Sequence, residues 1–164
     1  RTWYISINIG SSLAALALAT DPPTPEALQR PPDNPKSGLL SYHMKRMIVG
    51  MSAAHIAIML LLQNLGSKWI ENAAQHRSFI FNTFIFLQLF NEINCRVLDR
   101  SLNVFRHIFS NPFFIVIWLG TAIVQVGIIF LGGEAFSTVP LTWQQWLVSI
   151  AIGTASLPIG FLIR

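Results

Sequence analysis

The sequence has 164 residues, of which 52% are apolar and only 11% are charged. A soluble domain carries roughly 25% charged residues, so this composition cannot cover a globular surface with polar groups. The net charge is +4, but the basic residues do not cluster among aromatic residues, as nucleic-acid binding requires. The single cysteine, Cys95, excludes an internal disulfide. The composition thus excludes a water-soluble domain and a nucleic-acid partner, and it favours the lipid bilayer as the solvent of this chain.

Five charge-free apolar segments of 14 to 19 residues predict membrane-crossing helices; a full crossing takes about 20 helical residues. In chain order, these segments are Trp3–Ala19, Met47–Leu65, Ser78–Asn91, Phe113–Leu131 and Trp146–Ile163. The first is the weakest because several polar side chains interrupt it. The pattern predicts an all-α fold, a polytopic transmembrane helix bundle of about five spans, that forms one domain over residues 1–164.

The segments between the predicted spans are of two kinds. Asp21–Ser41 is polar and contains six prolines, which block helix continuation, so we expect a loop. Arg96–Pro112 is basic and amphipathic, which is typical of a segment at the membrane surface. Gly66–Arg77 and Gly132–Thr142 are expected to be short links. Within the last span, Pro158 predicts a kink.

The distribution of basic residues predicts the orientation of the chain. The basic residues on one side of the predicted membrane are Arg30, Lys36, Lys45, Arg46, Arg96, Arg100, Arg106 and Arg164, and those on the other side are Arg1, Lys68 and Arg77. Because Lys and Arg are enriched in cytoplasmic loops, we expect a multi-pass protein with a cytoplasmic C-terminus. Vacuolar, plasma and endoplasmic reticulum membranes differ by only a few Å in thickness, so the choice among them stays open.

One predicted helix, Phe79–Arg96, is unusually polar for a membrane span. Residues three and four apart are neighbours on a helix, so Gln88, Asn91, Glu92 and Cys95 fall on one face. Polar side chains at membrane depth face a bundle interior or an aqueous path, and amide and carboxylate oxygens are ligands for hard cations. An ion pathway is one interpretation. Hydrogen bonding to neighbouring helices is the other, and the pattern leaves both open.

Two further polar residues lie within the predicted spans, His55 and Gln125. We interpret both as hydrogen-bonded packing residues. The sequence contains no nucleotide-binding or hydrolase motif of the kinds GxxxxGKS, GxSxG or HExxH. We therefore expect no catalytic residues and no bound cofactor in this chain.

Three motifs in the same order resemble the C-terminal membrane part of P-type calcium-transporting ATPases. LAALALATDPPTPEAL (13–28) resembles the end of the sixth helix and the loop after it. FNTFIFLQLFNEINCR (81–96), followed by LNVFRHIFSNPFF (102–114), resembles the eighth helix and the loop into the ninth. GGEAFSTVPLTWQQWL (132–147) resembles the link into the tenth helix. Gln88 and the adjoining Asn-Glu-Ile-Asn sequence are closest to the plasma-membrane and vacuolar branch of this family.

The resemblance implies the transmembrane part of an ATP-driven calcium pump that supports the ion pathway. Calcium would be the transported substrate, and Gln88 would lie near it as a neutral oxygen ligand. ATP and magnesium would act only in the full-length family, whose DKTG motif with the phosphorylated aspartate is absent from this sequence. We therefore expect a fragment that is inactive alone, with the bilayer and other membrane helices as partners.

The start of the sequence departs from the family pattern. The sixth helix of the family carries an Asn-x-x-x-Asp pair that ligates calcium, and Ile7 and Ser11 stand at those positions here. Asn8 is one residue out of register, which is about 100° of rotation on a helix. No acidic residue precedes Asp21. Residues 1–11 are therefore predicted to be atypical, and a calcium site without that carboxylate should bind poorly.

An alternative is a standalone, pump-derived membrane protein that acts by helix–helix association. Small residues in Ser12–Ala19 would allow close approach of a second helix. An unrelated channel is disfavoured because no segment resembles a selectivity filter.

Overall fold

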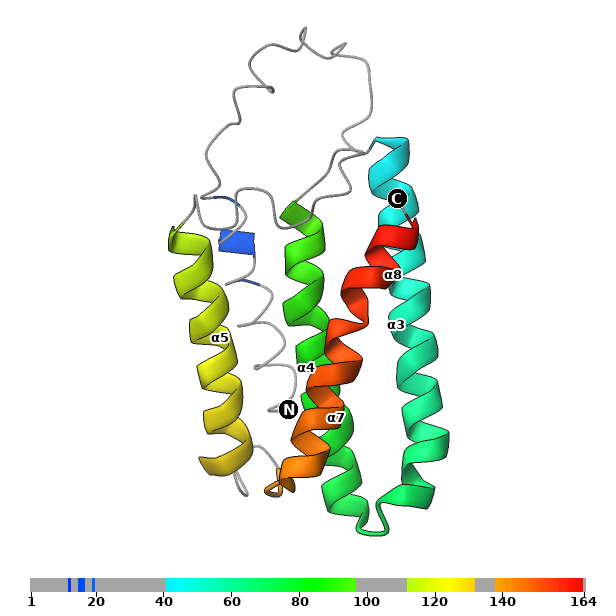
Figure 1. Ribbon diagram of the computed structural model, residues 1–164, viewed down its shortest axis with the longest axis vertical. Coiled ribbons are helices and arrows are strands. Elements are labelled where there is room, and N and C mark those ends of the chain that lie inside the picture. The colour runs from blue at the N-terminus through cyan, green and yellow to red at the C-terminus, as the bar shows by residue number, and fades with distance from the viewer. Residues whose placement is uncertain are drawn as a thin grey trace, which may run out of the picture.

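A computed structural model describes residues 41–96, 112–131 and 138–163, together with residues 12, 15, 16 and 19. In these parts of the chain every regular element is a helix. The long elements are α3 (Tyr42–Trp69), α4 (Ala73–Arg96), α5 (Pro112–Leu131), α7 (Trp143–Thr154) and α8 (Ser156–Ile163). They lie side by side as elongated columns (Figure 1). The predicted all-α bundle is confirmed.

Polar caps set where three of the helices begin. The hydroxyl of Ser41 accepts a hydrogen bond from the Met44 amide at the start of α3. Asn72 Oδ1 accepts from the amides of Ala74 and Gln75 at the start of α4. Thr142 forms a capping box with Gln145 before α7. Such caps satisfy amides that the first helical turn leaves unpaired.

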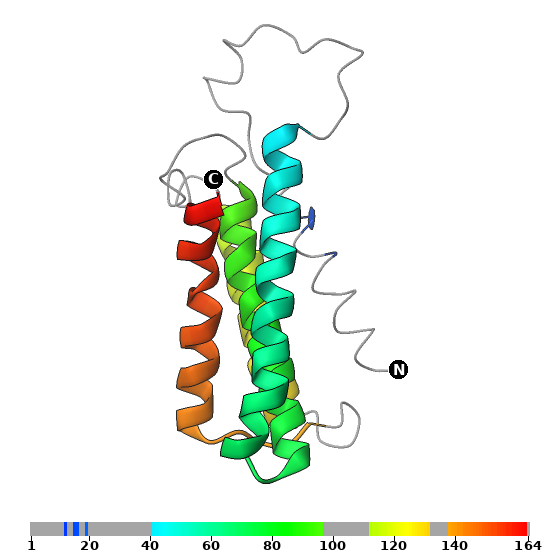
Figure 2. The same cartoon turned by 90° about the vertical axis from the view of Figure 1, so that its right-hand side faces the viewer.

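The predicted link Gly66–Arg77 is wrong at both ends. α3 continues through Gly66 to Trp69, and α4 already begins at Ala73, so only residues 70–72 connect them. The reason is local: the Ile70 amide bonds the Gly66 carbonyl to close α3, and Asn72 immediately caps α4. Two long antiparallel helices with a tight turn between them result, as the lower part of Figure 2 shows.

The predicted kink in the last span is confirmed. α7 ends at Thr154 and α8 begins at Ser156, with Ala155 in a turn between them. Pro158 has no N–H to donate to the carbonyl of Thr154, so the regular helical ladder is interrupted at this point. The two short helices still form one continuous column in Figure 1.

α4 lies at the centre of the bundle. It packs against α3, α5, α7 and α8, and Figure 1 shows it between α5 and α3, with the column formed by α7 and α8 crossing in front of it. α4 runs parallel to α7 and α8, and antiparallel to α3 and α5. Its buried side chains include Phe79, Phe81 and Leu87, and Phe79 and Phe81 form a core with Ile129 of α5.

The prediction of about five spans is confirmed in part. Within the described parts of the chain, three helical columns are long and apolar enough to cross a membrane: Tyr42–Trp69, Pro112–Leu131 and the combined Trp143–Ile163. α4 is long enough but too polar in composition to be counted among them, and several of its polar groups are buried against neighbouring helices. The predicted span Trp3–Ala19, the loop Asp21–Ser41 and the surface segment Arg96–Pro112 lie largely outside the described residues.

Candidate functional site: the groove between α3 and α4

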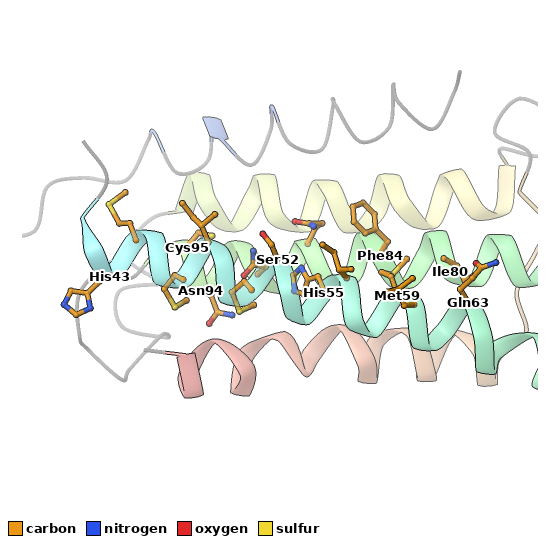
Figure 3. A pocket seen from close by; sticks show the side chains of 17 residues that line it. His43, Ser52, His55, Met59, Gln63, Ile80, Phe84, Asn94 and Cys95 are labelled. Atoms are coloured by element: carbon orange, nitrogen blue, oxygen red, sulfur yellow. The ribbon is translucent and has the colours of Figure 1, made fainter. Parts of the chain in front are cut away.

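An open groove of about 1080 Å³ runs between α3 and α4. We call it the α3–α4 groove; α3 lines it from His43 to Gln63, and α4 lines it from Ile80 to Cys95. Figure 3 shows side chains from both helices converging on this space. The α3 wall is mostly apolar and the α4 wall carries several amides, so the groove can accommodate both a helix surface and polar ligands.

The apolar wall contains all of the methionines in the sequence. They are Met44, Met47, Met51 and Met59, and each lines the groove. Their spacing on α3 follows the helical repeat, which was visible in the sequence but was not used in the predictions. Methionine side chains are flexible and adapt to irregular surfaces, so this wall can fit against an uneven neighbour.

The polar wall is the face of α4 that the sequence singled out. Gln88, Asn91 and Cys95 line the groove together, as predicted, and Gln88 is exposed to it. Glu92 is not among the lining residues, and Asn94 lines the groove instead. The predicted face is therefore correct for three of its four members.

This part of α4 buries side-chain oxygen atoms that lack a hydrogen-bond donor. Oδ1 of Asn91 and Oε2 of Glu92 have no partner among the described residues. A buried acceptor without a donor is costly, so both positions favour a group that supplies positive charge or N–H donors. Of these two residues, Asn91 lines the groove, beside Gln88.

The opposite faces of α4 use polar residues to hold the bundle together. The Thr83 hydroxyl donates to Ser149 Oγ of α7 at 3.1 Å. The Gln125 side-chain amide of α5 donates to Asn82 Oδ1 at 2.9 Å. The Trp118 indole N–H donates to the Leu89 carbonyl at 2.8 Å. The interpretation of such residues as interhelical contacts is confirmed on these faces, and Gln125 packs as predicted.

The other predicted packing residue is also confirmed. His55 is buried, and its Nε2 shares a hydrogen bond of 3.2 Å with Ser156 Oγ of α8. Asn94 reaches the same serine from α4, donating to its backbone carbonyl at 2.8 Å. The sequence did not predict that three helices meet at Ser156. The only hint was the nearby Pro158.

The groove offers amide oxygens as cation ligands. No group of three or more His, Cys, Asp or Glu side chains assembles among the residues that the structure describes. Calcium takes six to eight oxygen ligands, so Gln88 and Asn91 can supply only part of a coordination sphere. A complete site would need oxygens, and negative charge, from outside the described helices.

Three apolar columns packed around a polar central helix define a polytopic helical membrane protein. Residues 5–164 match the family described as cation transporting ATPase, C-terminus. The chain belongs to this family of cation-transporting ATPases and corresponds to its C-terminal membrane part.

Relatives agree with this family assignment. Calcium-transporting ATPase 2 of Schizosaccharomyces pombe is 46% identical over 159 residues, which cover 95% of this chain and 12% of that protein. Calcium-transporting ATPase PAT1 of Dictyostelium discoideum is 40% identical over 168 residues, covering 95% and 15%. The human plasma membrane calcium-transporting ATPase 3 is 40% identical over 166 residues, covering 94% and 14%. This chain therefore spans only 12% to 15% of the length of these relatives.

Proposed function

We propose that this chain serves in an ATP-driven calcium pump, where its helices support the ion pathway through the membrane. One observation carries the proposal: in a family whose similar members are calcium-transporting ATPases, α4 presents Gln88 and Asn91 to an open groove. Polar groups at membrane depth are retained where they face an interior or an aqueous path. Calcium is the transported substrate, and ATP and magnesium act elsewhere in the complete pump.

The chemistry of the groove limits the role of this chain. Amide oxygens ligate calcium without neutralising its charge, and ligand charge sets affinity. Gln88 is therefore a helper ligand beside carboxylates that come from outside α3 and α4. The family pattern has an Asn-x-x-x-Asp pair where this chain has Ile7 and Ser11. We therefore predict that residues 1–11 do not supply the missing carboxylate.

We extend the same proposal to topology. α4 crosses the membrane as a further span, although it is too polar to be recognised by apolarity, because the apolar columns α3, α5 and α7–α8 pack around it. Trp3–Ala19 forms the fifth span. The C-terminus then lies in the cytoplasm, on the side that the basic residues favour.

A chimaera tests the proposed function. In the S. pombe calcium-transporting ATPase 2, the region that matches residues 12–164 is replaced by those residues of this chain, so that the relative keeps its own sequence where residues 1–11 are atypical. Calcium uptake is then measured in vesicles from cells without other calcium pumps. We expect ATP-dependent uptake well above that of vesicles without the chimaera. An expressed and correctly inserted chimaera without uptake contradicts the proposal.

Gln88→Ala in this chimaera is expected to raise the calcium concentration for half-maximal uptake by roughly two- to tenfold, the scale of one lost polar interaction. Gln88→Glu should restore or increase affinity because it adds negative charge. Gln63→Ala is the matched control, since Gln63 is an exposed amide that lines the same groove from α3. Equal calcium affinity for Gln88→Ala and the unsubstituted chimaera would make Gln88 a packing residue only.

A second proposed function is helix–helix association. Ser12, Ala15, Leu16 and Ala19 are helical and exposed, and their spacing puts them on one face of a helix. Small residues allow close approach of another membrane helix. Uptake by the chimaera would favour the pump, whereas an inactive chimaera with a self-associating chain would favour this alternative.

A further inference from the structure

Ser156 is the point at which three helices are joined by side chains. It is fully buried at the break between α7 and α8. His55 of α3 binds its hydroxyl at 3.2 Å, and Asn94 of α4 binds its carbonyl at 2.8 Å. Asn94 is 1% exposed and His55 is 6% exposed. We call this arrangement the Ser156 joint.

Glycine residues allow side chains of neighbouring helices to pack closely beside the joint. A Cβ atom at Gly160 would lie 2.5 Å from Asn94 Nδ2, so Asn94 occupies space that only a glycine leaves open. On the other side of the joint, a Cβ at Gly50 of α3 would lie 2.8 Å from Ile163 of α8. Both α3 and α4 are therefore held against α8 at short distance, with a buried polar contact in between.

The joint lies at the depth of the amides of the α3–α4 groove. α4 and the last column run parallel, with Phe86 against Gly153 and Asn94 against Gly160. Ser156 falls between these two pairs, at the level of Gln88 and Asn91. His55 and Asn94 themselves line the groove. The joint thus connects the two walls of the groove through α8, at the level of Gln88 and Asn91.

The two walls are also connected at the other end of the groove. His76 Nε2 lies 3.1 Å from the Leu62 carbonyl of α3, and a Cβ at Gly66 would lie 2.7 Å from the same nitrogen. Residues 70–72 add the covalent turn nearby. The width of the groove beside Gln88 depends on the joint, because this other connection lies several helical turns away.

We infer that His55, Asn94 and Ser156 are positioning residues, which set the separation of α3 and α4 and thereby hold Gln88 and Asn91 at the distance that calcium binding requires. The effect of these residues on calcium transport depends on the proposed function. The positioning itself is a property of the folded chain, so it can be measured without activity.

The first experiment uses the S. pombe chimaera and measures calcium-dependent ATP hydrolysis. His55→Ala is expected to raise the calcium concentration for half-maximal activity about two- to tenfold, while the maximal rate per inserted protein changes less than about twofold. His55→Gln keeps a hydrogen-bonding group and should restore near-normal affinity. Ser156→Ala combined with His55→Ala should cost no more than either change alone, because partners in one interaction are non-additive.

Thr83→Val is the matched control. It removes a buried hydrogen bond of similar length between α4 and α7, on a face of α4 away from the groove. It should lower stability while leaving the calcium dependence unchanged. An equal shift in calcium dependence for Thr83→Val and His55→Ala would overturn the inference, as would an unchanged dependence in every joint variant.

The second experiment uses the full chain in nanodiscs, with Cys95→Ser and spin labels at positions 52 and 88, which line opposite walls and are exposed. We expect His55→Ala to lengthen or broaden the distance distribution, and Thr83→Val to leave it unchanged. An inactive chimaera with this distance change would reject the proposed function but support the joint. An active chimaera with no change in distance or calcium dependence would reject the joint alone.

Discussion

Gly153→Leu is expected to abolish the native packing of this chain. A Cβ at Gly153 would lie 2.7 Å from Phe86 Cβ and 3.1 Å from the Phe86 backbone carbon of α4. Backbone cannot move aside as a side chain can, so the two helices must separate. Even Gly153→Ala should cost roughly 1–3 kcal/mol by overpacking, and leucine should cost more. Thermal unfolding in detergent, followed by size-exclusion chromatography, measures the loss.

Gly120→Leu and Gly127→Leu on α5 provide the controls. Among the residues that the structure describes, a Cβ at either glycine meets nothing within 4 Å. Leucine is also a better helix former than glycine, by about 0.8 kcal/mol. We therefore expect equal or slightly higher stability for these variants. A Gly153→Leu chain as stable as the controls would show that α4 and α7 do not pack at the described distance.

The buried amide pair Asn82–Gln125 is expected to produce the second largest effect. Asn82→Leu leaves the buried amide of Gln125 without its partner, which should lower the free energy of unfolding by about 1–3 kcal/mol. The double substitution Asn82→Leu with Gln125→Leu should recover most of this loss, because neither helix then buries an unpaired polar group. Unfolding in mixed micelles with increasing denaturing detergent measures all three proteins.

Gln144→Leu is the matched control for this pair, since Gln144 is an exposed amide on α7. It should change the free energy of unfolding little. If the double substitution were no more stable than Asn82→Leu, the loss would not come from the unpaired amide of Gln125, contrary to our expectation. Asn82 Nδ2 has no hydrogen-bond partner among the described residues, which limits the benefit that the native pair can provide.

Apolarity and proline chemistry predicted much of the fold. The span Phe113–Leu131 differs from α5 by a single residue, because an uninterrupted apolar run has sharp ends and Pro112 suits a first helical position. The break beside Pro158 was predicted for the same kind of local reason. The start of α4 was predicted too late, because its first turns are polar and the Asn72 cap was not recognised.

The candidate site was predicted only in part, because helical spacing reports which residues share a face and not what that face meets. Spacing placed Gln88, Asn91 and Cys95 together correctly, but it could not assign Glu92 to a different environment. The contact between His55 and Ser156 joins residues 101 positions apart. No periodicity within a helix encodes such a pairing, so the joint became visible only once the helices were packed.

The glycine contacts of α4 have a consequence for how this domain can move. Gly153 packs against the Cβ and backbone of Phe86, and Gly160 packs against the side chain of Asn94, so sliding α4 by one turn would drive these groups into the last column. The two columns can therefore shift only as one rigid body. α3 is held by comparable glycine contacts near its two ends, at Gly50 and Gly66, and flexible thioethers line the groove beside them. Among the described helices, this methionine-lined wall is therefore the surface best able to change shape, while α8 moves together with α4.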